Sequence, residues 1–148
     1  MPAKGIHHVD LTVTDVARSL EFYLALLEPL GWSEFARYPT YRGTEEVIYL
    51  SAFGTGADLG LRAADGGKHE YYNVGIEHLA FEAASRDEVD AAHERCLARG
   101  DQVHFPPGED RDIPGYYAVF VFDPDGIRVE VFCWPEGRPI RTAPAGER

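Results

Sequence analysis

Two stretches of this chain of 148 residues repeat one another: Gly5-Ile6-His7-His8-Val9-Asp10-Leu11 and Gly75-Ile76-Glu77-His78-Leu79-Ala80-Phe81. They align at a constant offset of 70 residues as Gly-Ile-x-His-aliphatic-x-Leu/Phe. Each is followed by a helix-like stretch and then by strand-like runs. A chain that repeats itself, with a histidine at the same point of each copy, predicts two structural halves that face each other around one polar centre.

The first copy begins with a predicted strand at residues 6–13. Its alternate residues form an apolar face and a polar face, and the polar face carries His8, Asp10 and Thr12. A period of two residues is typical of a strand with one buried side. Asp15 is the predicted N-cap of an amphipathic helix at 15–27. Three further strands are predicted around residues 32–38, 46–53 and 57–62.

The second copy repeats this order after a Gly-rich, charged linker at residues 63–72. A strand is predicted at 76–83, and a capping box of Ser85 and Glu88 opens a helix that Gly100 ends. Three strands follow around 101–105, 116–122 and 127–132, with Asp123-Pro124-Asp125-Gly126 as the last turn. In each half the helix covers the apolar side of its sheet. The polar sides of the two sheets are left to enclose a cleft.

The composition predicts a soluble, acidic, globular protein. Hydrophobic residues make up 45% of the chain and charged residues 26%, and the formal net charge is −11. Such acidity disfavours nucleic acid and anionic membranes, because phosphate binding needs clustered Lys and Arg. Two cysteines do not form a disulfide framework, so a reducing cytoplasm is the expected location. No apolar run approaches the roughly 20 residues that span a bilayer.

Three side chains form the candidate chemical centre. His8 and His78 lie on the less apolar face of the first strand of each half, whereas His7 shares the face of Val9. In the last strand Glu130 points the same way as the two histidines, if the two sheets are built alike. Two imidazoles and one carboxylate are a common facial ligand set for a divalent metal, with positions left open for water or substrate.

These residues resemble the vicinal-oxygen-chelate superfamily, which groups glyoxalases, bleomycin-resistance proteins, fosfomycin-resistance enzymes, methylmalonyl-CoA epimerases and extradiol dioxygenases. The resemblance covers residues 5 to about 134. It is carried by His8-Val9-x-Leu11-x-Val13, then Asp15, Ser19 and Phe22-Tyr23, then His78-Leu79-Ala80-Phe81, and then Asp123-Pro124-Asp125-Gly126 with Glu130 four residues on.

The resemblance implies an α+β fold of two paired βαβββ modules that form a curved sheet around a metal-binding cleft. The modules would be residues 5–62 and 75–133 of a single domain at 1–134, followed by a flexible tail at 135–148. The metal would be held by His8, His78 and Glu130. Iron, manganese, nickel, cobalt and zinc all suit such ligands, and the sequence does not choose among them.

Two departures from the family bear on the reaction. Aligning Gly56 with Gly126 puts Gly60 opposite Glu130, so the fourth ligand of glyoxalase I and the epimerases has no counterpart there. The Tyr of extradiol dioxygenases is replaced by Phe120. We expect a metal-dependent lyase, isomerase or dioxygenase that acts on a small oxygen-rich molecule chelated through two oxygens. The alternative is a non-catalytic protein that sequesters an antibiotic, as bleomycin-resistance proteins do.

Several other residues are predicted to serve the site. Tyr116 is a candidate catalytic residue as a hydrogen-bond donor or acid. Asp10 and Thr12 are candidates for orienting the histidines. Candidate substrate-binding residues are Tyr117, Phe120 and His104. A homodimer is expected, because eight short strands leave sheet edges to cover. Whether the cleft forms within one chain or across two chains stays open.

Overall fold

The structure of the protein is a computed structural model that describes residues 5–43, 45–53 and 57–135. The first half contains β1 (His8–Val13), α1 (Val16–Leu27), a 3₁₀ turn η1 (Glu28–Leu30), β2 (Ser33–Pro39), β3 (Glu46–Ser51) and β4 (Asp58–Ala63). The second contains β5 (Leu79–Glu82), α2 (Arg86–Arg99), β6 (Val103–Glu109), β7 (Tyr117–Phe122) and β8 (Arg128–Cys133). Nearly all of the predicted tail at 135–148 lies outside the described residues.

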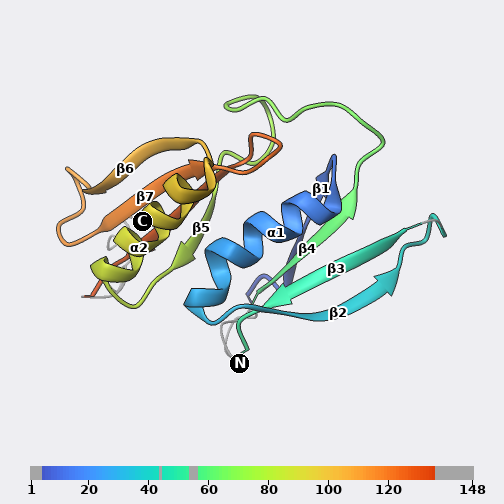
Figure 1. Cartoon of the computed structure of the whole chain (residues 1–148), viewed down its shortest axis with the longest axis horizontal. Helices are drawn as coiled ribbons and strands as arrows, with labels where there is room; N and C mark the ends of the chain where they lie inside the picture. The colour runs from blue at the N-terminus through green and yellow to red at the C-terminus, as the bar shows by residue number, and fades with distance from the viewer. Residues whose placement is uncertain (1–4, 44, 54–56, 136–148) are drawn as a thin grey trace, which may run out of the picture.

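The strands form two four-stranded sheets with the same topology, ordered β1-β4-β3-β2 and β5-β8-β7-β6 (Figure 1). In each sheet the first and last strands of the half are parallel, and the other neighbours are antiparallel. The offset of 70 residues also relates β4 to β8. The predicted α+β fold of two paired modules is therefore confirmed.

The two helices begin where the sequence predicts. The Asp15 side chain accepts a hydrogen bond from the Arg18 amide (3.0 Å) and caps α1, and Ser85 caps α2 by accepting from the Glu88 amide (3.3 Å). Gly100 ends α2 with a φ of 78°, which a glycine adopts without strain. α1 buries one face against its sheet through Phe22, Tyr23, Leu26 and Leu27.

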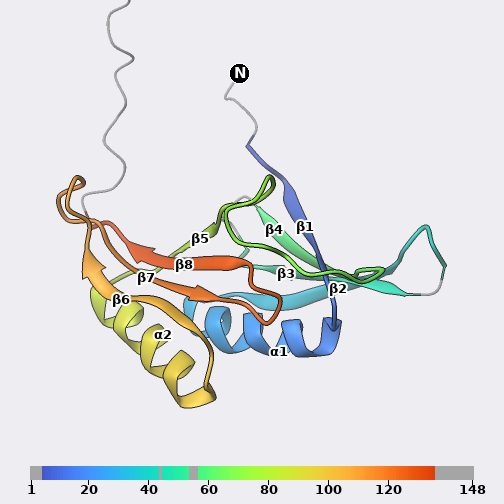
Figure 2. The same ribbon diagram turned by 90° about the horizontal axis from the view of Figure 1, so that it is seen from above.

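Both helices lie on one side of the two sheets, and the other face of each sheet is open (Figure 2). The residues between β4 and β5 run along this open side (Figure 2). β5 begins at Leu79, three residues later than predicted, because its pairing with β8 begins at Leu79 and Val129. The backbone just before Leu79 therefore does not alternate as a strand would.

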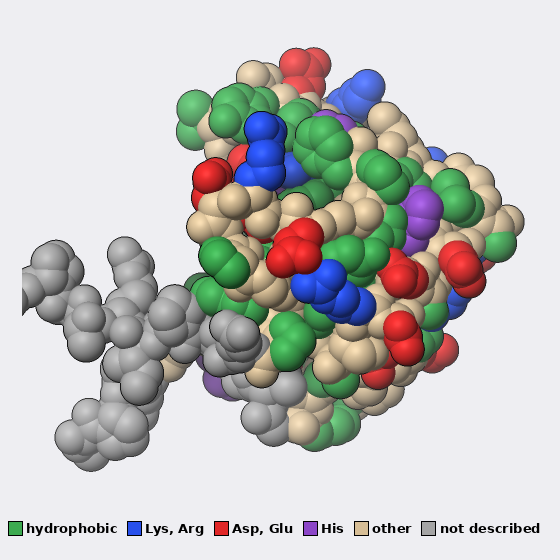
Figure 3. Space-filling model, turned by 90° about the vertical axis from the view of Figure 1, so that its left-hand side faces the viewer, with side chains coloured by type: hydrophobic (Ala, Val, Ile, Leu, Met, Phe, Trp, Pro, Cys, Tyr) green, Lys and Arg blue, Asp and Glu red, His purple; other side chains and the backbone are tan. Residues whose placement is uncertain are grey.

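Charged and hydrophobic side chains are interspersed on the face that the second module presents (Figure 3). The chain carries 25 acidic and 14 basic residues, so its surface is acidic overall. Within the described ranges, no helix is long and apolar enough to cross a membrane.

The predicted turn at residues 123–126 also joins the two modules. The Asp125 carboxylate accepts hydrogen bonds from the Thr14 amide (3.0 Å) and from the Thr14 hydroxyl. The Asp123 carboxylate is buried and accepts from the Tyr23 hydroxyl (2.9 Å) and from the Ile127 amide (2.8 Å). Burial raises the pKa of Asp123. A turn of the second module is thus fixed to the first strand and helix of the first module.

Replacing Tyr23 with phenylalanine should weaken this hydrogen-bonded contact between the two modules. The buried Asp123 carboxylate loses a donor, and an unsatisfied buried acceptor costs about 1–3 kcal/mol. We expect Tyr23→Phe to lower the free energy of unfolding by that amount in urea denaturation. Tyr41→Phe is the matched control, because Tyr41 is 92% exposed, and it should change stability by less than about 0.5 kcal/mol. Equal effects of the two changes would contradict the account.

Candidate functional site

His78 and Glu130 meet on the open face of the second sheet. The Nε2 atom of His78 lies 3.0 Å from Oε2 of Glu130. His78 stands immediately before β5, and Glu130 lies in the middle of β8, paired with Ala80. Glu130 is only 3% exposed, although it lies on the face that no helix covers. The structure therefore brings together two of the three predicted metal ligands.

The second oxygen of Glu130 is bound by Tyr116. The Tyr116 hydroxyl donates to Oε1 of Glu130 over 2.6 Å, and its ring stacks on Phe132 with centroids 4.9 Å apart. Burial raises the pKa of Glu130, while the Tyr116 hydroxyl and the nearby His78 oppose that rise. Each carboxylate oxygen thus has a defined partner, a phenol on one side and an imidazole on the other.

Glu77 holds the other nitrogen of His78. Its Oε2 contacts Nδ1 of His78, and its Oε1 accepts from Arg128 (2.6 Å) and from Tyr71 (3.0 Å). The hydrogen bond with His78, together with those from Arg128 and Tyr71, lowers the pKa of Glu77 to about 2. Glu77 is therefore ionised at neutral pH. A carboxylate on one ring nitrogen fixes the imidazole and directs the other nitrogen to the site.

Aromatic rings surround the site on the second sheet. The Arg128 guanidinium lies 4.0 Å from the centroid of the Phe120 ring, and the His78 and Phe120 ring centroids are 5.8 Å apart. His104 stacks on Phe105 with a centroid distance of 4.1 Å. Burial and the charge of Arg128 lower the pKa of His104. The predicted residues Phe120 and His104 therefore line the same face as Glu130.

His8 occupies the equivalent place in the first module. Its ring lies 5.8 Å from that of Tyr49, which repeats the spacing of His78 and Phe120. His8 is exposed, and its Nδ1 lies 3.0 Å from Nδ1 of His7. Across residues 5–43, 45–53 and 57–135, no group of three His, Cys, Asp or Glu side chains lies close enough to hold a metal ion. Within one chain, then, His8 does not join His78 and Glu130.

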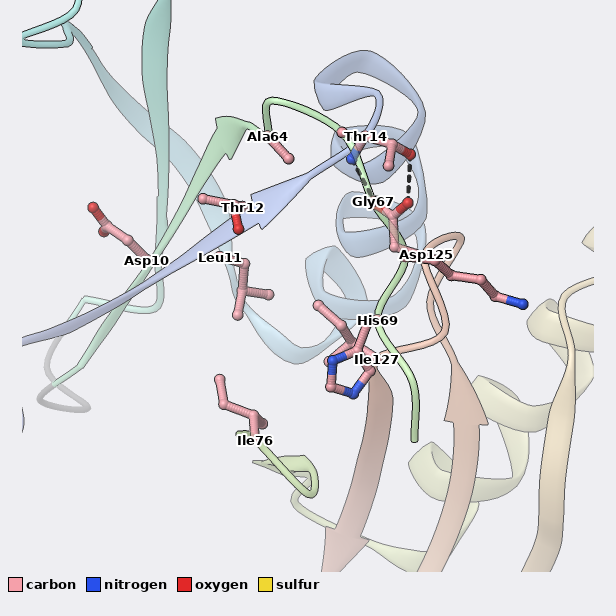
Figure 4. Close-up of a pocket in the computed structure, with 12 residues that line it drawn as sticks. Asp10, Leu11, Thr12, Thr14, Ala64, Gly67, His69, Ile76, Asp125 and Ile127 are labelled. Carbon is pink, nitrogen blue, oxygen red and sulfur yellow. Dashed lines mark hydrogen bonds between the residues drawn. The ribbon is translucent and has the colours of Figure 1, made fainter. Parts of the chain in front are cut away.

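The other predicted residues lie in three different places. The Asp10 carboxylate accepts from Arg62 (2.9 Å) and from Tyr49 (3.3 Å) on the open face of the first sheet. Thr12 is exposed and lines a cavity of about 380 Å³ between the modules (Figure 4). The Tyr117 hydroxyl donates to Asp90 of α2 (2.7 Å), so Tyr117 lies on the helix side, away from Glu130.

Two residues of the site, Glu77 and Tyr71, are not among the site residues predicted from the sequence. Strand alternation from residue 76 would put Glu77 on the opposite face from His78. The backbone there is outside β5, so both side chains reach the same site. Arg128 shares the alternation of Glu130 in β8, and that shared face was a signal for it.

The spacing of the two donor atoms fits a divalent cation. A histidine nitrogen and a carboxylate oxygen are common ligands of such ions, and His78 Nε2 and Glu130 Oε2 converge to 3.0 Å. The imidazole is fixed with Nε2 toward the site, and the carboxylate is buried where a cation would balance its charge. The donor set on the second module therefore suits a metal, and it needs at least one more protein ligand.

Comparison with known proteins extends the resemblance to the whole fold. Residues 5–131 match the family model of the Glyoxalase/Bleomycin resistance protein/Dioxygenase superfamily. The protein YqjT of Bacillus subtilis is 32% identical over 134 residues, which are 85% of this chain and 96% of YqjT.

Solved structures agree with that match. A glyoxylase/bleomycin resistance protein/dioxygenase domain from Frankia has a TM-score of 0.73 at 27% identity, covering 90% of this chain and 99% of its own. A glyoxalase/bleomycin resistance protein from Albidiferax ferrireducens has a TM-score of 0.66 at 26% identity, covering 90% and 98%. The fosfomycin resistance protein FosX from Listeria monocytogenes, 20% identical, shares the fold with a TM-score of 0.66, covering 89% and 94%.

The repeated module, its sheet order and these matches agree along almost the entire described chain. This chain belongs to the glyoxalase/bleomycin resistance protein/dioxygenase superfamily.

Proposed function

We propose that the protein is a metal-dependent enzyme that acts on a small molecule with two neighbouring oxygen atoms. His78 and Glu130 of one chain and His8 of the partner subunit would hold the cation. A divalent cation held by these residues would supply Lewis-acid chemistry toward both substrate oxygens. The reaction is of the lyase, isomerase or dioxygenase type.

The convergence of His78 Nε2 and Glu130 Oε2 carries this proposal. A carboxylate that is 3% exposed, beside an imidazole, is expensive to bury unless a cation or donors balance its charge. Glu77 fixes the imidazole from behind. An accidental surface contact would not have a buried acid, a fixed histidine and a phenol in one place.

The unpaired edges of β1 and β5 support a dimer that shares the site. In the described sheets β1 pairs with β4 and β5 pairs with β8, so each strand has one free edge. Free edges of this kind are usually covered in native proteins. His8 lies exposed on β1. A second copy that covers these edges can bring its own His8 to the pair formed by His78 and Glu130.

Residues of the second module orient the groups of the proposed site. Tyr116 holds Oε1 of Glu130, so Oε2 is the oxygen turned toward His78. Its hydroxyl is the acidic group closest to that carboxylate and is proposed to exchange a proton with the substrate. Arg128 is fixed between Glu77 and the Phe120 ring, and it supplies positive charge beside the open face for an anionic substrate group. Phe120 and Phe105 give that side an apolar lining, with ring centroids 6.1 Å apart.

Metal binding should depend on all three proposed ligands. We expect the purified protein to bind one Mn²⁺ per chain in isothermal titration calorimetry. His8→Ala, His78→Ala and Glu130→Ala should each weaken binding at least about 100-fold, because three protein ligands hold the ion. His93→Ala and Glu94→Ala, both on α2, are controls and should bind as the parent protein does. Absence of binding by the parent protein would favour the sequestering alternative and contradict the proposal.

Mixing of defective chains tests whether two chains share one site. In a dimer of one His8→Ala chain and one His78→Ala chain, one site keeps His78, Glu130 and His8 of the partner subunit, and the other loses both histidines. Random pairing of co-expressed chains should restore about a quarter of the parental sites. Each variant alone should bind Mn²⁺ at least about 100-fold more weakly than the parent protein. If the mixture binds no more tightly than either variant alone, His8 is not contributed across a dimer.

A further inference from the structure

The open face of the second sheet contains a hollow over β6 and β7. This cavity of about 300 Å³ is lined by Gly108 and Ala118, which are paired in register, and by the rings of the flanking residues. Tyr117 donates to α2, so its neighbour Ala118 lies on the face that the helix does not cover (Figure 2). Two small side chains at adjacent places of this face leave the space of the hollow.

The first module fills the equivalent place with side chains. Counted back two positions from the ring that lies beside each histidine, the residue is Val47 in β3 and Ala118 in β7. Val47 pairs with Tyr38, whereas Ala118 pairs with Gly108. A valine and a tyrosine therefore occupy in one module the place that an alanine and a glycine leave empty in the other. The hollow is a property of the second module and not of the shared fold.

The backbone does not require glycine at position 108. Gly108 is not among the glycines with a positive φ. A Cβ atom placed on it would have the Pro106 carbonyl oxygen as its nearest neighbour, at 3.9 Å. Because residues paired directly across two strands point to the same face, a side chain at this position would stand beside Ala118 and enter the hollow. Gly108 thus keeps open a space that the strand could have filled.

The hollow adjoins the pair of donor atoms described above. Ala118 lies between Tyr116 and Phe120 on the same face of the chain. Tyr116 donates to Oε1 of Glu130 (2.6 Å), and Phe120 is paired with Glu130 in register. The hollow is therefore one side-chain place away from Glu130 along the sheet. A molecule bound at His78 and Glu130 can extend a substituent into it.

The rings around the hollow suit a hydrocarbon group. The rings of Phe105 and Phe120 lie edge to face, with centroids 6.1 Å apart. The Tyr116 ring stacks on Phe132, and its hydroxyl is engaged by Glu130. Aromatic rings pack favourably against one another in offset and edge-to-face arrangements. A ring bound over Ala118 would meet such partners on both sides.

The charged groups at the rim of the hollow are bound elsewhere or solvated. The Glu109 carboxylate accepts from Arg86 (3.1 Å) and from the Gly115 amide (3.2 Å). The Asp110 carboxylate accepts from two amides of the loop that follows it (2.8 and 2.9 Å). Arg111 is exposed, so water solvates its charge. These groups do not call for a charged ligand inside the hollow.

We propose that the hollow over Gly108 and Ala118 binds an apolar, ring-sized substituent of the substrate. The inference rests on the proposed function, because the two neighbouring oxygens of that substrate are the ones bound at the cation. It adds the substrate class. Since the hollow lies beside Glu130 and not over it, the two oxygens belong to a short chain that carries the ring, and not to the ring itself.

The experiment measures the affinity of the Mn²⁺-loaded full chain for L-lactate and L-3-phenyllactate by calorimetry. Both acids offer a hydroxyl and a carboxylate oxygen on neighbouring carbons, and they differ only in a phenyl ring. The parent protein should bind phenyllactate at least about 10-fold more tightly, because the ring leaves water for an apolar hollow.

Filling the hollow should remove this preference. Gly108→Leu should bind the two acids alike and leave the affinities for Mn²⁺ and lactate unchanged. Ala118→Val, which copies the first module, is a second variant and should reduce the preference in the same direction. Ala98→Leu adds the same side chain at an exposed position of α2 and is the control that should keep the parental preference.

The outcomes separate this inference from the proposed function. If the parent protein binds Mn²⁺ but shows no preference between the two acids, the cation site stands and the hollow is not its substrate pocket. If G108L and A118V keep the preference and the parental melting temperature, the ring binds elsewhere and the inference is wrong. If the parent protein binds no Mn²⁺, the proposed function itself fails and the inference falls with it.

Discussion

The buried carboxylate of Glu130 is the constraint on which the candidate site depends. It lies in the middle of β8, on the uncovered face of its sheet, and is still almost wholly withdrawn from solvent. A charge in that position needs partners on both oxygens. Tyr116 and His78 supply them, Glu77 holds His78, and Arg128 donates to Glu77. The last strand of the second module thereby organises residues from the segments that lead into β5 and β7.

The two modules share most of their structural features but differ in which strand carries the acidic residue. The backbone order, the parallel pairing of first and last strands and the ring beside each histidine are repeated. The acidic residue is not, since it lies on β8 in one module and on β1 in the other. The joint formed by Asp123, Asp125, Thr14 and Tyr23 then fixes the modules to one another.

Much of the fold could be predicted from alternation, caps and glycine. The helices, the eight strands and the paired modules follow from residues such as Asp15, Ser85 and Gly100, whose local chemistry determines where an element begins or ends. Alternation also predicted that His78 and Glu130 share a face, and their side chains do meet, although His78 lies just before β5. Alternation does not place Glu77 beside them, because it holds only where strands pair, and pairing in β5 begins at Leu79. Tyr117, a predicted substrate-binding residue, donates instead to Asp90 of α2.

The central claim is that one cation joins His78 and Glu130 of one chain to His8 of a second. Anomalous diffraction at the manganese absorption edge, from crystals of the Mn²⁺-loaded protein, tests it most directly. The account predicts one peak per chain, bonded to Nε2 of His78 and Oε2 of Glu130 and to His8 of the partner subunit. A peak bonded to other side chains, or three ligands supplied by a single chain, would contradict it.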